Sequence, residues 1–173
     1  MSEPRIGRIL KDFAPGAGNP RNSEGAFLKR KDGTLLFVFS RFVGASDRDH
    51  ATANIAAVRS SDGGETWSEP EDLFTSAGHE AVNIMSVSLM RMRNGDIGLF
   101  YLVRKTFSDM RMILQRSADE GRTWSDLTVC MPRQGYFVVN NDRAVRLSTG
   151  RIVLPAAEHV VTRAPDGGLW YSR

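Results

Sequence analysis

Two polar segments of this sequence contain the residue types best suited to chemistry. The first is the charged stretch from 42 to 52, which includes Asp47 and Asp49. A carboxyl group on a loop over a pocket can donate or accept a proton while a bond is cleaved. The second is the run from Asn140 to Arg143, in which amides, a carboxylate and a guanidinium lie between apolar flanks. Because a planar guanidinium matches a carboxylate ligand, these segments indicate proton transfer and anion binding.

Each of these segments also has a simpler interpretation. A charged turn in solvent would have the composition of residues 42–52, and a hydrogen-bonded polar network would explain residues 140–143. Only four of the 23 basic residues are lysine, which favours arginine chemistry but also fits the codon bias of a GC-rich genome. Cys130 lies in an apolar run and is interpreted as a packing residue. The sequence has no convincing metal-ligand spacing, so neither a metal nor another cofactor is predicted.

The composition narrows the class of protein. A hydrophobic content of 41% and a charged content of 25% are typical of a soluble globular chain. A net charge of only +3, with scattered arginines, argues against nucleic acid as a partner. The sequence has no apolar stretch long enough to span a membrane and no hydrophobic segment near Met1 that resembles a secretory signal. We therefore expect no membrane partner and a cytoplasmic location.

A repeated octapeptide predicts the elements that must position the polar segments. The pattern Ser-x-Asp-x-Gly-x-Thr-Trp begins at Ser60 and again at Ser117, 57 residues later. Its Asp can accept backbone hydrogen bonds in a tight turn, its Gly can adopt positive φ, and its Trp can bury a large apolar face. A repeat of this period is typical of the blades of a β-propeller. The pattern residues are Ser60, Asp62, Gly64, Thr66 and Trp67, then Ser117, Asp119, Gly121, Thr123 and Trp124.

Three hairpin signals fit the same repeat. Gly33, Gly95 and Gly150 each lie in a polar turn between two apolar runs. We predict an all-β chain with a lead-in at 1–20, a first blade at about 21–75, a second at about 82–131 and an incomplete third at about 136–173. The expected strands are 22–29, 34–41, 52–59 and 67–74, then 83–92, 96–104, 109–116 and 124–131, then 137–147, 151–157 and a strand beginning at 168. A third octapeptide would be due near 172–177.

The octapeptides resemble the Asp boxes, or bacterial neuraminidase repeats, of the sialidase superfamily. This resemblance implies a six-bladed β-propeller, of which the chain would contain about two and a half blades. In that family the box lies at the outer edge of a blade, away from the central site. Asp62 and Asp119 are therefore expected to be turn-capping residues and not catalytic ones.

The resemblance also implies roles for residues in the first blade. Sialidases bind the sugar carboxylate with three arginines, the first of which lies in an early Arg-Ile-Pro motif. Arg21 occupies that place here, although Asn22 and Ser23 depart from the motif. Arg41 matches an arginine that ends the second strand in the family, and the acid/base aspartate follows it. Both Asp47 and Asp49 fit that position, and Asp49 is preferred.

Inner strands of a propeller line its axial pocket, which adds further predicted binding residues. Aligning the three hairpin glycines matches Glu24 with Ser86 and Asn141. The predicted substrate-binding set is completed by Asn83, Asn141 and Arg143. His79 and Glu80, on the loop that enters the second blade, are predicted at the rim of the pocket, and so are Glu158 and His159.

The implied function is a sialidase-like glycoside hydrolase that cleaves terminal sialic acid or a related sugar, with a carbohydrate as its partner. In that family the other two arginines, the Tyr nucleophile and its Glu partner come from later blades. We therefore expect this chain to be a fragment that is inactive alone. Copies that associate through exposed blade edges are the other interpretation. The alternative functions are a propeller hydrolase or lyase for another sugar, and a non-catalytic propeller that binds glycans or proteins.

Overall fold

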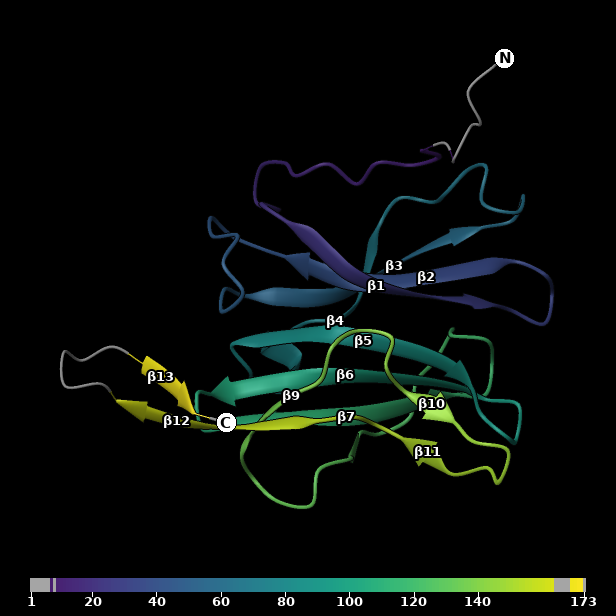
Figure 1. Ribbon diagram of the computed structural model, residues 1–173. Coiled ribbons are helices and arrows are strands. Elements are labelled where there is room, and N and C mark those ends of the chain that lie inside the picture. Colours follow the sequence, from purple (N-terminus) through teal and green to yellow (C-terminus); the bar gives the residue numbers. More distant parts are fainter. Residues whose placement is uncertain (1–6, 8, 164–168, 173) are drawn as a thin grey trace, which may run out of the picture.

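The computed structural model describes residues 7, 9–163 and 169–172, and it is built from antiparallel β-sheets. Within those residues the helical content is one short 3₁₀ turn, η1 (Ala77–His79), which confirms the predicted all-β class. No helix in the described part of the chain is long and apolar enough to cross a membrane. The sheets lie in successive layers, with the first blade above the second and the third below (Figure 1).

The first blade is a four-stranded sheet in the order β1–β2–β3–β4. Its strands are β1 (Asn22–Lys29), β2 (Leu35–Phe42), β3 (Ala53–Ser60) and β4 (Glu71–Phe74). The first three agree with the predicted ranges to within one residue. The fourth begins later than predicted, because residues 67–70 still belong to the turn that leaves β3. There the backbone N–H of Ser68 donates to the carbonyl of Arg59 at 2.9 Å.

The second blade repeats this arrangement. Its strands are β5 (Asn83–Arg91), β6 (Ile97–Thr106), β7 (Asp109–Ser117) and β8 (Thr128–Val129). The strand β8 pairs with β7 over two residues only, at Ile113 and Leu114. The outer strand of this blade is therefore much shorter than the two strands inside it.

The third blade has the predicted hairpin with interruptions in both strands. Its elements are β9 (Tyr136–Val138), β10 (Val145–Arg146), β11 (Ile152–Val153), β12 (Ala157–Arg163) and β13 (Leu169–Ser172). The strand β9 pairs with β12, and β10 pairs with β11. One parallel bridge, between Met110 and Tyr136, joins this blade to β7. Residues 168 and 173 of the last predicted strand, and most of the predicted third octapeptide, lie outside the described residues.

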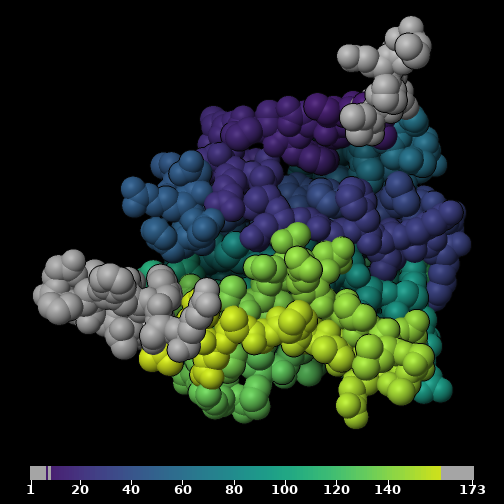
Figure 2. All heavy atoms as spheres, in the orientation of Figure 1, coloured from purple at the N-terminus to yellow at the C-terminus, as the bar shows by residue number. Residues whose placement is uncertain are grey.

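Apolar side chains between the layers form the core. One cluster joins the first two blades and includes Leu36, Ile55, Leu99 and Tyr101, all fully buried. A second cluster joins the second and third blades through residues such as Met112. The lead-in covers the other face of the first blade, as the purple segment along the top of Figure 2 shows. Because each blade has apolar residues on both faces, each sheet is buried by its neighbours and not by a helix.

The two octapeptide turns share the hydrogen bonds of their Ser, Asp, Gly and Thr residues. In each, the Ser hydroxyl donates to the Asp carboxylate at 2.8 Å and accepts the Gly N–H, at 2.9 Å in the first turn and 2.7 Å in the second. The same carboxylates, Asp62 and Asp119, accept both the N–H and the hydroxyl of the Thr at 2.9 and 2.6 Å. The Thr side-chain hydrogen bond is the main reason why the pKa of Asp62 falls to about 2. The octapeptide therefore encodes its turn locally.

Gly25 is required where the first strand passes an aromatic stack. A Cβ at this position would lie 2.1 Å from the Phe37 ring, which is stacked on Phe27 with ring centroids 4.3 Å apart and on Phe39 at 5.5 Å. Since these neighbours hold the ring, we expect Gly25→Ala to lower the free energy of unfolding by about 1–3 kcal/mol. Urea denaturation would measure this change. Gly16→Ala is the control, because no atom lies within 4 Å of that added Cβ; an equal loss in both variants would contradict the prediction.

Candidate functional site

Arg21 and Asp49 form an ion pair where the first strand begins. Arg21 Nη1 lies 2.5 Å from Asp49 Oδ1 and also donates to the carbonyl of Asp47 at 3.1 Å. The structure thus brings together the side chains of Arg21 and Asp49, whereas Asp47 meets Arg21 through its backbone carbonyl. The Asp49 side chain is 80% exposed, whereas that of Arg21 is 30% exposed. Exposed ion pairs contribute only about 0–1 kcal/mol, so a ligand can displace Asp49 from Arg21 at little cost.

Local contacts fix the position of Arg21. The Asn19 amide donates to the carbonyls of Arg21 and Phe42 at 3.0 and 2.7 Å, and the Phe42 N–H donates to the Arg21 carbonyl at 2.9 Å. The guanidinium lies over the Phe42 ring, 4.5 Å from its centroid. Because Phe42 is fully buried, this cation–π contact holds the charged group on a rigid surface.

Two buried side chains of the second blade hold the loop that carries Asp49. Asn83 Nδ2 donates to the carbonyl of Ala51, and Arg104 Nη2 donates to the carbonyl of His50, both at 2.5 Å. Arg104 is 3% exposed and Asn83 is fully buried. Asn83 was predicted to bind substrate, but with no exposed surface it positions the loop instead. The sequence prediction missed Arg104, because an arginine within an apolar strand carries no sign of its distant partner.

Glu24 adds a second carboxyl group beside Arg21. It bulges out of β1, with φ at 52°, and its Oε2 accepts a hydrogen bond from the Ser86 hydroxyl at 3.4 Å. Burial raises the pKa of Glu24, and the charge of Arg21 opposes that increase. Half-buried carboxyl groups with raised pKa values are suited to general acid–base work. The sequence signal for this residue was the alignment of the hairpin glycines, which matched it with Ser86.

A polar residue with positive φ recurs at a similar place in each blade, in a bulge of β1 and of β5 and in the turn before β10. These residues are Glu24, Ser86 and Asp142, with φ at 52°, 59° and 51°. The glycine alignment equated the first two with Asn141, which is one residue too early. The alignment was wrong because the chain leaves the ladder between Val138, which pairs with Ala157, and Val145, which pairs with Val153.

A pocket of about 370 Å³ lies beside the ion pair. Residues of all three blades line it: Asp49, His50, Phe107, Tyr136, Val138 and His159. The Phe107 and Tyr136 rings are stacked with centroids 6.4 Å apart. The sequence prediction gave no role to Phe107 or Tyr136, and placed His159 only at the rim. An aromatic surface next to a carboxylate and an arginine can hold the face of a sugar ring.

The other predicted binding residues lie elsewhere. Arg41 Nη1 is 3.1 Å from Asp72 Oδ1. By strand alternation Arg41 faces away from the second blade, whereas its neighbour Ser40 accepts the N–H of Ser86. Arg41 therefore does not join Arg21. Arg143 and Asn140 line an adjoining hollow that shares Val138 with the pocket, and Asn141, between them in the chain, is half-buried.

The residues predicted at the rim of the pocket lie in two separate parts of the structure. His159 lines the pocket beside Asp49, and Glu158 pairs with Arg133 at 2.6 Å. His79 and Glu80 line a different pocket, described below. In the described part of the chain, no group of three or more His, Cys, Asp or Glu side chains is arranged to hold a metal ion.

Solved structures share this fold at low sequence identity. The Hadza microbial sialidase Hz136 matches with a TM-score of 0.64 and 16% identity, over 90% of this chain and 36% of that one. The intramolecular trans-sialidase from Ruminococcus gnavus gives 0.64 and 12%, over 88% and 59%. The GH93 α-L-arabinofuranosidase of Fusarium graminearum gives 0.58 and 18%, over 93% and 47%. The chain thus spans about a third to three fifths of the length of these proteins.

These similarities confirm sialidase-type propeller blades, with only part of the blade set in this chain. No curated protein matches the sequence. The profile of the BNR repeat-like domain covers residues 13–129, which is well over half of the chain and includes both octapeptides and the Arg21–Asp49 pair. The chain therefore belongs to the BNR repeat-like domain family.

Proposed function

We propose that this chain supplies the Arg21–Asp49 part of a glycoside hydrolase site for a terminal acidic sugar of the sialic acid type. The observation that carries the proposal is the displaceable ion pair at the edge of an aromatic pocket. A sugar carboxylate that replaces Asp49 on Arg21 would bind the guanidinium fork in one orientation. The displaced Asp49 would then be free to reach the glycosidic oxygen.

The two carboxyl groups would have different environments. Asp49 is exposed on a loop, whereas Glu24 is half-buried and has a raised pKa. A pair of carboxyl groups in unlike environments is the usual arrangement for acid and base roles. Asp49 is the proposed proton donor to the leaving group, after it takes up a proton from solvent when the sugar carboxylate replaces it on Arg21. Glu24 is the proposed second carboxyl group of the site, where it interacts with the charge of Arg21 and accepts a hydrogen bond from Ser86.

Sugar binding tests the proposal directly. Titration of ¹⁵N-labelled chain with N-acetylneuraminic acid should shift the amides of Arg21, Asp49 and Tyr136, and Arg21→Ala should weaken binding by about tenfold or more. Arg41→Ala is the matched control and should change affinity by less than about twofold, since Asp72 holds that guanidinium. Equal losses in the two variants would contradict the proposed site. We expect binding without turnover of a fluorogenic sialoside by this chain alone.

A neutral terminal sugar is the second candidate ligand. Arg21 and Arg41 are both already paired with carboxylates, which reduces the positive potential offered to an anion. One protein of the same fold is an α-L-arabinofuranosidase whose structure is a complex with arabinobiose. A parallel titration with arabinobiose distinguishes the two, because its binding should not depend on Arg21.

A further inference from the structure

A second pocket, of about 350 Å³, lies on the second blade beside the segment that links it to the first. Val103 of β6 and Ile113 of β7, which are 8% and 3% exposed, form its floor, and Leu127 and Val129, before and within the short strand β8, form its outer side. The chain that links the blades, at Gly78–Glu80, forms the facing wall. The pocket shares no lining residue with the pocket beside Asp49.

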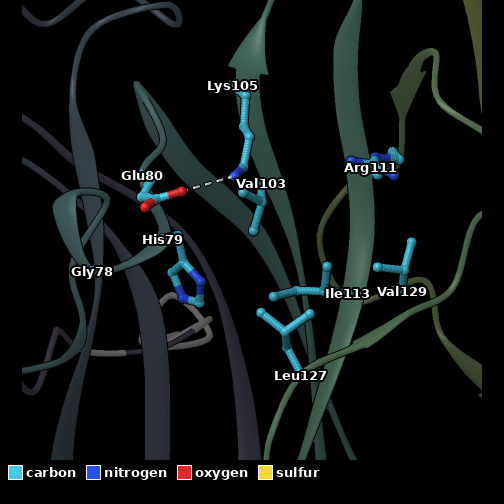
Figure 3. A pocket seen from close by; sticks show the side chains of 9 residues that line it. All are labelled: Gly78, His79, Glu80, Val103, Lys105, Arg111, Ile113, Leu127 and Val129. Carbon is cyan, nitrogen blue, oxygen red and sulfur yellow. Dashed lines mark ion pairs between the residues drawn. The ribbon is translucent and has the colours of Figure 1, made fainter.

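The pocket has one charged side and one apolar side. Figure 3 shows Glu80, Lys105 and Arg111 along the upper side of the opening, with His79, Ile113, Leu127 and Val129 below them. Leu127 and Val129 are 49% and 43% exposed, although they are large apolar residues. Apolar surface that remains open to solvent beside a charged rim is typical of ligand sites.

The two cations on the rim remain able to bind an anion. Lys105 Nζ lies 3.6 Å from Glu80 Oε2, and the Glu80 side chain is 90% exposed, so this pair is weak. Asp109 occupies Nε and Nη2 of Arg111 at 2.7 and 3.1 Å, which leaves Nη1 to meet a further acceptor. Asp109 is itself nearly buried and holds the Arg111 side chain in a fixed direction.

The side of the pocket that His79 forms is held in place by hydrogen bonds and ring packing, and it carries no charge. The Tyr101 hydroxyl donates to Gln115, and Gln115 Nε2 donates to the carbonyl of Ser125 at 2.8 Å. Tyr101 Oη must therefore accept the hydrogen of His79 Nε2, which lies 2.8 Å away. Burial, aided by the charge of Lys105, lowers the pKa of His79, so its ring is neutral near pH 7. Rings of Phe74 and Tyr101 pack against it at 5.9 and 5.5 Å.

We propose that this pocket binds a small monocarboxylate with a ring-sized apolar body. The carboxylate would lie between Lys105 Nζ and Arg111 Nη1, and the ring would lie on Ile113, Leu127 and Val129. A sugar fits less well, since the lower side offers aliphatic carbon to hydroxyl groups that need hydrogen-bond partners. This inference goes beyond the proposed function and does not depend on it.

Benzoate and benzamide test the proposal, because they share a ring and differ in charge. In a ¹H–¹⁵N titration of the 173-residue chain, benzoate should shift the amides of Glu80, Lys105 and Arg111 with a Kd on the order of millimolar. Benzamide should bind at least about fivefold more weakly. Lys105→Met should weaken benzoate binding by about fivefold and leave benzamide unchanged.

Two steric variants and one distant variant complete the test. Val129→Phe should fill the pocket and abolish binding of both probes, whereas Val145→Phe, on an exposed strand of the third blade, should not. Arg21→Ala should leave benzoate binding unchanged, which separates this site from the proposed sugar site. Equal affinity for the two probes, full benzoate affinity in Lys105→Met or Val129→Phe, or no shift at these amides would each overturn the proposal.

Discussion

Leu99→Ala is expected to lower the free energy of unfolding by about 2–5 kcal/mol. Leu99 is fully buried in the cluster that joins the first two blades, and it pairs with Leu89 and Gln115 on the neighbouring strands. Truncation would leave a cavity between two sheets that are held together mainly by this apolar contact. Such a loss is a large part of the total stability of a domain, which is about 5–15 kcal/mol. Urea denaturation followed by circular dichroism would measure it.

The control makes the same chemical change at the surface. Leu147, in the hairpin turn of the third blade, is 44% exposed, and its truncation should cost less than about 1 kcal/mol. If both variants unfolded at the same urea concentration, the cluster between the blades would not be the main source of stability.

Glu120→Gln is expected to lower the free energy of unfolding by about 1.5–3 kcal/mol at neutral pH. Glu120 lies in the second octapeptide and accepts from Arg91 Nη1 and Nη2 at 2.6 and 2.8 Å. It also accepts the backbone N–H of Lys31, in the first blade, at 3.0 Å, and its carboxylate lies 3.4 Å from Lys31 Nζ. One carboxylate thus connects the two blades, and an uncharged amide with one acceptor oxygen cannot replace it.

The effect of Glu120→Gln should depend on pH in a defined direction. Hydrogen bonds from Arg91 lower the pKa of Glu120 from its ordinary 4.5 to about 2. Because the folded-state pKa is the lower one, this stabilisation is complete above about pH 4.5 and is lost as the pH falls towards 2. The difference in stability between the parent and Glu120→Gln should therefore narrow over that range. Glu69→Gln, at a side chain that is 91% exposed, should match the parent at every pH; a gap that stayed constant for Glu120→Gln would contradict this account.

Much of the fold could be predicted because its signals are local. Six of the first eight strands begin within one residue of the predicted position, since alternating apolar runs and turn glycines lie next to each other in the chain. The octapeptides also close their own hydrogen bonds, as the Asp62 to Thr66 contacts show. The third blade was less predictable. Its residue with positive φ is Asp142 and not the predicted equivalent Asn141, because pairing with a distant strand sets the register.

The candidate site, like the fold, could be predicted only in part. Family resemblance predicted Arg21, Asp47 and Asp49, and the structure brings together the side chains of Arg21 and Asp49, with the backbone carbonyl of Asp47 beside them. Family resemblance did not reveal that Asn83 and Arg104 donate hydrogen bonds to the backbone of the loop that carries Asp49. It also did not reveal that Asp72 pairs with Arg41 on the opposite face of the first sheet. Each of these contacts joins residues 31 to 54 positions apart, and the Arg41 contact also depends on which face of the strand the side chain occupies.

The sequence by itself determined the blades, their order and the positions of the turns. The twin octapeptides and the three hairpin glycines carry that information in short contiguous segments, whose hydrogen bonds form within a few residues. The tertiary structure alone decided which polar residues meet. Packing of one sheet on another brings Tyr136 of the third blade and Asp49 of the first to one pocket, and a second pocket lies between His79 and the short strand β8. Contacts of this kind depend on the close fit of many apolar side chains between the blades, and no short sequence pattern records that fit.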